Sequence, residues 1–178
     1  MTDPKPFSVK INHPYGEEEP SLGWIYLTFE TGDSKITLHV SDVNDPLFDP
    51  ALVFLRFMDN ADSGPIHIEI DEEIEIKEIR ILPLADQQVQ FEVADYDYRN
   101  SEYYDPTEVE EDPEYPHTYI DIEINRDILI TTFFSSFIDF LENGFQPERW
   151  REDDIRPFYL PAVKERFLSY LNDKQQPL

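Results

Sequence analysis

Isoleucine alternates with charged residues along residues 66 to 82, and this is the most regular pattern in the chain. The isoleucines at every second position are Ile66, Ile68, Ile70, Ile74 and Ile76. Because successive side chains of a strand point to opposite faces, this spacing predicts one face in a core and one in water. The alternation changes phase between Ile76 and Ile79. We therefore expect a hairpin that turns at residues 71 to 73, with a bulge near Lys77 in its second strand.

The same period of two recurs in five further segments. These are residues 7–11, 22–30, 35–41, 89–93 and 119–124. Pro6 before the first segment and Pro14 after it are typical of an edge strand. Turn residues join the second and third segments, which form a hairpin. The pattern predicts a mainly antiparallel, twisted sheet of about six to seven strands that grows as a meander.

Three segments have the period of a helix. Asp49 and Pro50 are suited to the start of a helix that ends near Asp59. A longer helix is expected over residues 126–143, capped by Asn125 and closed by a glycine, and a last helix over 160–173. The apolar face of the sheet is the largest surface available to these helices. The expected fold is therefore a single α+β domain over residues 1–178, with two to three helices packed on one face of the sheet.

Charge changes this picture more than any other feature of composition. The chain has 39 acidic and 14 basic residues, for a net charge of −25 and a pI of about 4.2. Residues 1–125 hold 30 acids and 7 bases, net −23, whereas residues 126–178 hold 9 and 7, net −2. Such a field repels nucleic acid and favours a basic protein as partner. The simpler interpretation is that the acidity only keeps the protein soluble.

Composition also excludes several classes of function. The chain has no cysteine, so disulfides, thiolate catalysis and thiolate metal sites are absent. With 13 Phe, 10 Tyr and 2 Trp it does not have the composition of a disordered acidic chain. No apolar run approaches the length of a membrane span, and the first residues lack a signal sequence. We expect a cytoplasmic protein of bacterial type, without membrane or nucleic-acid binding, that is a monomer or a weak homodimer.

Residues 95–118 form an acidic, tyrosine-rich insertion between two predicted strands. An insertion of this length without its own periodicity is usually functional or disordered. Tyrosine supplies contact area at interfaces, and carboxylates can receive Lys and Arg from a partner. The predicted partner-binding residues are Tyr96, Asp97, Tyr98, Tyr103, Tyr104, Asp105, Glu110, Glu111, Asp112, Glu114 and Tyr115. The alternatives are a mobile solvated loop, a cation site or an active-site lid.

Cofactor and metal chemistry finds little support in the sequence. Asp95 and Asp97 begin like a calcium loop, but Asn100 stands where glycine is required and Pro106 where a bidentate glutamate should be. The four histidines are far apart, and no HExxH pattern occurs. We predict no cofactor and no metal site, although a looser carboxylate site stays open.

Catalysis by carboxylates is the enzyme hypothesis that is hardest to dismiss. Two acids could divide the roles of proton donor and acceptor if burial separated their pKa values. Glu72 or Glu78 could fall in phase with the isoleucine face and would be the first to examine. Neither a GxSxG motif nor a glycine-rich phosphate loop is present, and the chain has only five glycines.

In size, charge and its tyrosine-rich acidic insertion, the chain is similar to bacterial immunity proteins that neutralise cationic toxins. The likeness lies in composition and includes no diagnostic motif. It implies a stoichiometric inhibitor that pairs its carboxylates with basic residues around the active site of a toxin or nuclease. We therefore expect a non-catalytic, acidic protein-binding module. The alternatives are a carboxylate-based hydrolase or lyase, and a structural or assembly subunit that self-associates through residues 145–158.

Overall fold

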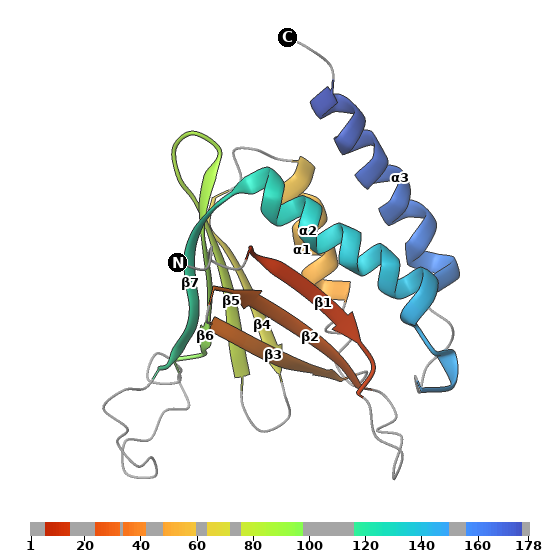
Figure 1. Ribbon diagram of the computed structural model, residues 1–178, viewed down its shortest axis with the longest axis horizontal. Coiled ribbons are helices and arrows are strands. Elements are labelled where there is room, and N and C mark those ends of the chain that lie inside the picture. Colours follow the sequence, from red (N-terminus) through yellow and green to blue (C-terminus); the bar gives the residue numbers. More distant parts are fainter. Residues whose placement is uncertain are drawn as a thin grey trace.

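Two antiparallel sheets and three α-helices make up the computed structural model, which describes residues 6–14, 24–32, 34–41, 48–59, 64–71, 76–97, 116–149 and 156–175. The fold is α+β (Figure 1). The seven strands agree with the predicted number, but they form two sheets rather than one.

The first sheet contains β1 (Ser8–Asn12), β2 (Trp24–Thr31) and β3 (Ser34–Ser41), in that order. The predicted β2–β3 hairpin is confirmed, with pairs from Trp24↔Ser41 to Thr31↔Ser34. Gly32 has a φ of +52° in the connection, a conformation that glycine adopts without a steric penalty. The first strand lies at an edge of the sheet, as its flanking prolines predict.

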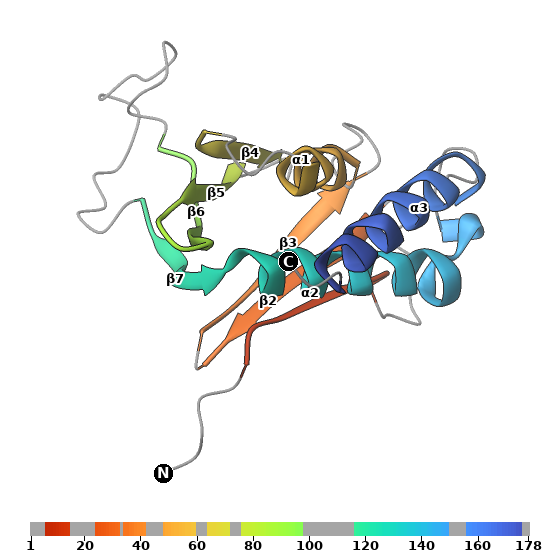
Figure 2. The ribbon, with the colours of Figure 1, turned by 90° about the horizontal axis from the view of Figure 1, so that it is seen from above.

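The second sheet is the meander β4 (Ile66–Asp71), β5 (Ile76–Pro83), β6 (Gln88–Asp95) and β7 (Thr118–Asn125). The sheets separate because α1 (Phe48–Asp59) lies between β3 and β4 in the chain. The edge strand β3 nevertheless passes close to both β4 and β7. The strands of the first sheet therefore run in front of the second sheet and across it (Figures 1 and 2).

The β4–β5 hairpin is confirmed, but the bulge predicted in it is wrong over the described pairs. Pairing continues without a register shift from Ile66↔Ile81 to Asp71↔Ile76. The phase change arises because Lys77 occupies an inward position between Ile79 and the turn. A register shift occurs instead between Val93 and Ala94 of β6, where Tyr119 of β7 is the extra residue.

The long helix begins as its sequence predicts. Asn125 caps α2 (Arg126–Asp139), and its side-chain oxygen accepts hydrogen bonds from the backbone N–H groups of Asp127 and Ile128. A π-helical turn, η2 (Phe140–Gly144), continues it, and a short 3₁₀ turn follows, η3 (Pro147–Arg149). The last helix, α3 (Arg156–Gln175), begins before the predicted position and contains Pro161.

Phenylalanine fills much of the core that the two sheets share with the helices. Phe29 of the first sheet contacts Phe91 of the second, with ring centroids 5.2 Å apart, and both rings are fully buried. Phe54 of α1 stacks on Phe133 of α2 at 4.0 Å. The second helix also runs along β1, where the Ser136 hydroxyl donates to the Val9 carbonyl at 2.7 Å. Among the described helices, none has the length and hydrophobicity needed to cross a membrane.

Candidate functional site

The outward face of the second sheet gathers charged side chains from all four of its strands. Pairing places the inward isoleucines of β4 opposite those of β5, so the intervening positions point outward together. The outward charged residues are Glu69, Glu78, Arg80, Glu92, Asp121 and Glu123, and His67 lies among them. Five carboxylates and one arginine give this surface, which we call the acidic face, a net charge of −4.

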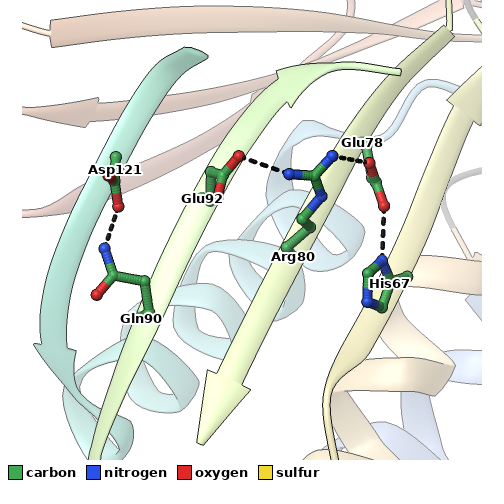
Figure 3. A network of polar contacts seen from close by, with 6 residues as sticks. All are labelled: His67, Glu78, Arg80, Gln90, Glu92 and Asp121. Carbon is green, nitrogen blue, oxygen red and sulfur yellow. Dashed lines mark hydrogen bonds and ion pairs between the residues drawn. The ribbon is translucent and has the colours of Figure 1, made fainter. Parts of the chain in front are cut away.

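A chain of polar contacts runs from His67 to Glu92 on the acidic face, and a separate contact joins Gln90 to Asp121 (Figure 3). Arg80 is its centre: Nη2 donates to Glu78 Oε2 at 2.5 Å, and Nη1 donates to Glu92 Oε1 at 2.9 Å. The other oxygen of Glu78 lies 2.6 Å from His67 Nδ1. On the far side, the Gln90 amide donates to Asp121. The arginine therefore ties neighbouring strands together through two carboxylates.

Carboxylates stand directly opposite one another at two places on this face. Glu69 of β4 pairs with Glu78 of β5, and Glu92 of β6 pairs with Asp121 of β7. Like charges at paired positions destabilise a sheet. In each pair one acid is bonded to Arg80, while the other, Glu69 or Asp121, is exposed to solvent. Glu69 and Asp121 therefore keep an exposed negative charge opposite another carboxylate, and this placement does not stabilise the sheet.

Hydrogen bonds determine the direction in which the pKa of Glu78 is shifted. Its side chain is only 9% exposed, and burial alone would raise the pKa of the carboxyl. Hydrogen bonds from Arg80 and then His67 outweigh burial, so the pKa of Glu78 is lower than usual. The same contacts with Glu78 raise the pKa of Arg80. Glu78 therefore stays ionised at neutral pH, as an anchor for Arg80.

A buried ion pair lies on the opposite face of the same sheet. Lys77 of β5 and Asp95 of β6 are paired across the strands, and Nζ donates to Oδ1 at 2.6 Å, with both side chains less than a tenth exposed. The Tyr119 hydroxyl donates to the same oxygen of Asp95 at 2.9 Å. The backbone N–H of His117 donates to the other oxygen at 3.1 Å. We call these four residues the clasp.

The clasp joins the two ends of the predicted insertion. Asp95 is the last residue of β6, and His117 precedes β7, so the carboxylate links the strand that enters the insertion to the strand that leaves it. Backbone bonds add to this link, since Asp95 N–H donates to His117 and Tyr96 N–H to Ile76. Burial would raise the pKa of Asp95, but the bonds from Lys77, His117 and Tyr119 lower it. The clasp is therefore a satisfied charge rather than a proton donor.

Only two of the predicted partner-binding residues fall in the described part of the chain. Tyr96 and Asp97 directly follow the clasp, and both are partly exposed. Both follow the last residue of β6, so the insertion begins at the end of the sheet that carries the acidic face. The Asp97 charge has a small part in raising the pKa of Arg80, after those of Glu78 and Glu92. The remaining predicted residues lie outside the described residues: Tyr98, Tyr103, Tyr104, Asp105, Glu110, Glu111, Asp112, Glu114 and Tyr115.

Among the described histidines, His13 is the buried one. It is 4% exposed and lies between β1 and the turns after α2. Its Nδ1–H donates to the Trp24 carbonyl at 3.2 Å, and Nε2 accepts from the Gln146 N–H at 3.0 Å. Burial lowers the pKa of His13, so the ring is neutral and serves as a structural link. A cleft of about 390 Å³ lies next to it, between β1 and η2.

Sequence reasoning missed the contacts that Lys77 and Arg80 make with carboxylates. The signal for Lys77 was present: the isoleucine alternation changes phase at this residue, and the prediction explained that change by a bulge. Glu78, selected as a carboxylate in phase with the isoleucine face, lies on the other face and is buried by Arg80 and His67 instead. Among the described residues, no group of three or more potential ligands is placed to hold a metal ion.

Comparison with known proteins adds no family to this description. No family model matches the chain, and neither a curated protein nor a solved structure resembles it significantly.

Proposed function

We propose that the protein is an acidic protein-binding module whose acidic face, together with the insertion beside it, receives a basic partner. The observation that carries the proposal is the one-sided charge of the second sheet. Five outward carboxylates are matched by Arg80 alone among the charged residues of this face. Complementary potential of this kind accelerates encounter with a cationic protein and rejects acidic ones.

The network indicates which carboxylates are available to a partner. Glu78 and Glu92 are held by Arg80 and act as supports. Glu69, Asp121 and Glu123 are exposed, and Asp121 and Glu123 lie two residues apart on one strand. A partner that brings Lys or Arg to these positions would relieve the like-charge pairs that the free protein tolerates. The relief of this repulsion would therefore contribute favourably to the free energy of binding.

An immunity-type role would explain why the protein binds a basic partner. A stoichiometric inhibitor of a basic bacterial toxin or nuclease would cover the cationic groove that the enzyme uses for nucleic acid. Tyr96 and the further tyrosines of the insertion would supply contact area beside the carboxylates. The clasp supports this role because it fixes both ends of the insertion on the sheet, which reduces the entropy lost on binding.

A carboxylate-based hydrolase or lyase finds less support. Such an enzyme needs an acid whose pKa is raised toward neutrality, so that it can donate a proton. The pKa values of Glu78, Asp95 and Asp127 are instead lower than usual, because hydrogen bonds outweigh the effect of burial. These three carboxylates suit binding and structure better than proton transfer.

The test is a binding experiment with two charge-reversed variants. The chain is immobilised and exposed to a panel of purified basic nucleases and toxins, with acidic proteins of similar size as a reference. One variant carries Glu69→Lys and Glu123→Lys on the acidic face. The matched control carries Glu165→Lys and Asp173→Lys, which make the same change in net charge at exposed positions of α3. Binding is measured in about 0.1 M and about 1 M salt, where the screening length falls from about 10 Å to about 3 Å.

The proposal predicts that one basic protein binds with a fixed stoichiometry and that high salt weakens the complex. The acidic-face variant should lose at least tenfold in affinity, while the α3 control retains most of it. Equal losses of affinity in both variants would mean that binding depends only on the net charge of the chain, and they would overturn the proposed site. Failure of every basic protein to bind would overturn the proposed function.

A further inference from the structure

The outward face of the first sheet differs in kind from the acidic face. Pairing in this sheet alternates in the same way, so Val9, Leu27 and Leu38 point into the core. The outward residues are Ser8, Lys10, Asn12, Trp24, Tyr26, Thr28, Glu30, Lys35, Thr37 and His39. Two lysines and one glutamate give a net charge of +1, on a chain whose total is −25. We call this surface the aromatic face.

Three rings stand together on the aromatic face, at the end away from the β2–β3 turn. Tyr26 stacks on His39, with centroids 4.7 Å apart and an angle of 25° between the planes. Trp24 meets the same His39 ring edge to face, at 6.4 Å and 84°. Because the rings cover one another, they form a raised ridge rather than a flat platform. Ridges of Trp and Tyr are typical of the centres of protein interfaces.

Hydroxyls and charges lie between this ridge and the turn of the hairpin. The Thr28 and Thr37 hydroxyls are hydrogen-bonded to each other at 3.0 Å on the neighbouring row of paired residues. The next row pairs Glu30 with Lys35 at the end of the hairpin. The face therefore has an aromatic end and, opposite it, an end with one charge of each sign. A two-fold axis through the middle of the face would place Lys35 of one copy near Trp24 of another, a cation–π contact made twice, which is the self-complementarity that a symmetric dimer requires.

From these observations we infer that the aromatic face is the contact between two copies of this chain. The charge distribution selects this partner. Two molecules of net charge −25 repel each other, so contact is favoured through surfaces with few carboxylates, and the described residues of this face include one. A basic partner would be drawn to the acidic face instead, and nucleic acid is repelled by the chain as a whole.

The size of the face sets the strength of the dimer. The strands are about 4.8 Å apart, with β2 and β3 about 26 Å long and β1 about 17 Å long, so they cover roughly 330 Å² per copy, or about 660 Å² in total. Stable interfaces bury about 1,200 Å² or more, so the dimer should be weak and depend on concentration. Repulsion between the copies opposes it, and salt screens that repulsion. Dimerisation should therefore strengthen with salt, whereas binding of a basic partner to the acidic face should weaken.

Sedimentation velocity tests this inference on the full chain, over a range of concentrations in about 0.1 M and about 1 M salt. The variant His39→Glu places a charge in the centre of the ridge. The matched control, Ser135→Glu, adds the same charge at an exposed position of α2. Thermal unfolding of both variants shows whether each one folds. We expect the wild type and Ser135→Glu to dimerise in high salt with similar constants, and His39→Glu to dimerise at least tenfold more weakly.

Several results would overturn the inference. These are a wild type that stays monomeric at every concentration and salt, association that weakens with salt, and a His39→Glu variant that dimerises normally. A monomer whose tryptophan fluorescence changes with a panel of soluble glycans would assign the ridge to carbohydrate instead. Because the acidic-face experiment responds to salt in the opposite direction, failure of the dimer and failure of the proposed function are distinguishable.

Discussion

The two sheets have the same alternation of apolar and polar residues, yet their outward faces are chemically opposite. On the first sheet, Trp24, Tyr26 and His39 form an aromatic ridge, and the charged residues nearly cancel. On the second sheet the outward positions are acidic, and Arg80 holds the face together. The alternation is what builds the two sheets, while the identity of the outward residues decides what each sheet can bind. A search for function in such a chain should therefore begin with the outward half of each strand.

The inward faces differ as well. The buried inward residues of the first sheet are apolar, whereas the second sheet buries the clasp next to its isoleucines. Burying an ion pair contributes little net stability, because desolvation cancels most of the attraction. The clasp is therefore better explained by its place than by its energy, since it lies where the insertion leaves the sheet and returns to it.

Removing one partner of the clasp should have the largest effect on stability. Lys77→Met leaves the Asp95 carboxylate buried without its cation, and we expect a loss of about 3–5 kcal/mol in the free energy of unfolding. The double variant Lys77→Met with Asp95→Leu should lose clearly less than the single variant, because no charge is then buried. Denaturant unfolding measures both. A loss below about 1 kcal/mol in the single variant would mean that the pair is not buried.

Replacing Arg80 should have a smaller effect on stability. It should lower the stability of the fold but raise the affinity for a basic partner. Arg80→Gln removes the cation between Glu78 and Glu92, which leaves the like-charge pairs without compensation. Since the side chain is 27% exposed, we expect a loss of about 1–2 kcal/mol in stability. The acidic face becomes more negative, so the affinity for a basic partner should rise in low salt. Lower affinity, measured by calorimetry on the folded variant, would show that Arg80 itself contacts the partner.

Much of the architecture follows from the sequence, because burial enforces strict alternation. The seven strands, the β4–β7 meander and the Asn125 cap all agree with the local pattern. The division into two sheets does not, since strand pairing depends on where α1 directs the chain after β3. The change of phase marked Lys77, but the sequence could not show why a lysine is buried there, because its partners Asp95 and Tyr119 are distant in sequence.

Acid should weaken the second sheet through its bonded carboxylates. The pKa of Glu78 and that of Asp95 are lower in the folded protein than the unfolded values of about 4.3 and about 3.9. A lowered pKa contributes stability above the unfolded value, and this contribution is lost as pH falls through the folded value. Stability should therefore decline below about pH 4. Glu78→Gln should flatten this decline, whereas Glu165→Gln, which removes an exposed carboxylate of α3, should leave it unchanged.

The smallest effect is expected on the outward face of the first sheet. Thr28 and Thr37 are paired across β2 and β3, and their hydroxyls bond only to each other in the described structure, at 3.0 Å. Replacing both with valine keeps the shape and the preference for strands, and it leaves neither hydroxyl unsatisfied. Stability should change by less than about 0.5 kcal/mol, in contrast to the loss caused by Arg80→Gln on the other sheet. A single Thr28→Val variant should be slightly less stable than the double variant, because one hydroxyl loses its partner. A strong loss of stability in the double variant would contradict this prediction. The outward polar groups would then stabilise both sheets to a similar extent, and the aromatic face and the acidic face would not differ in this respect.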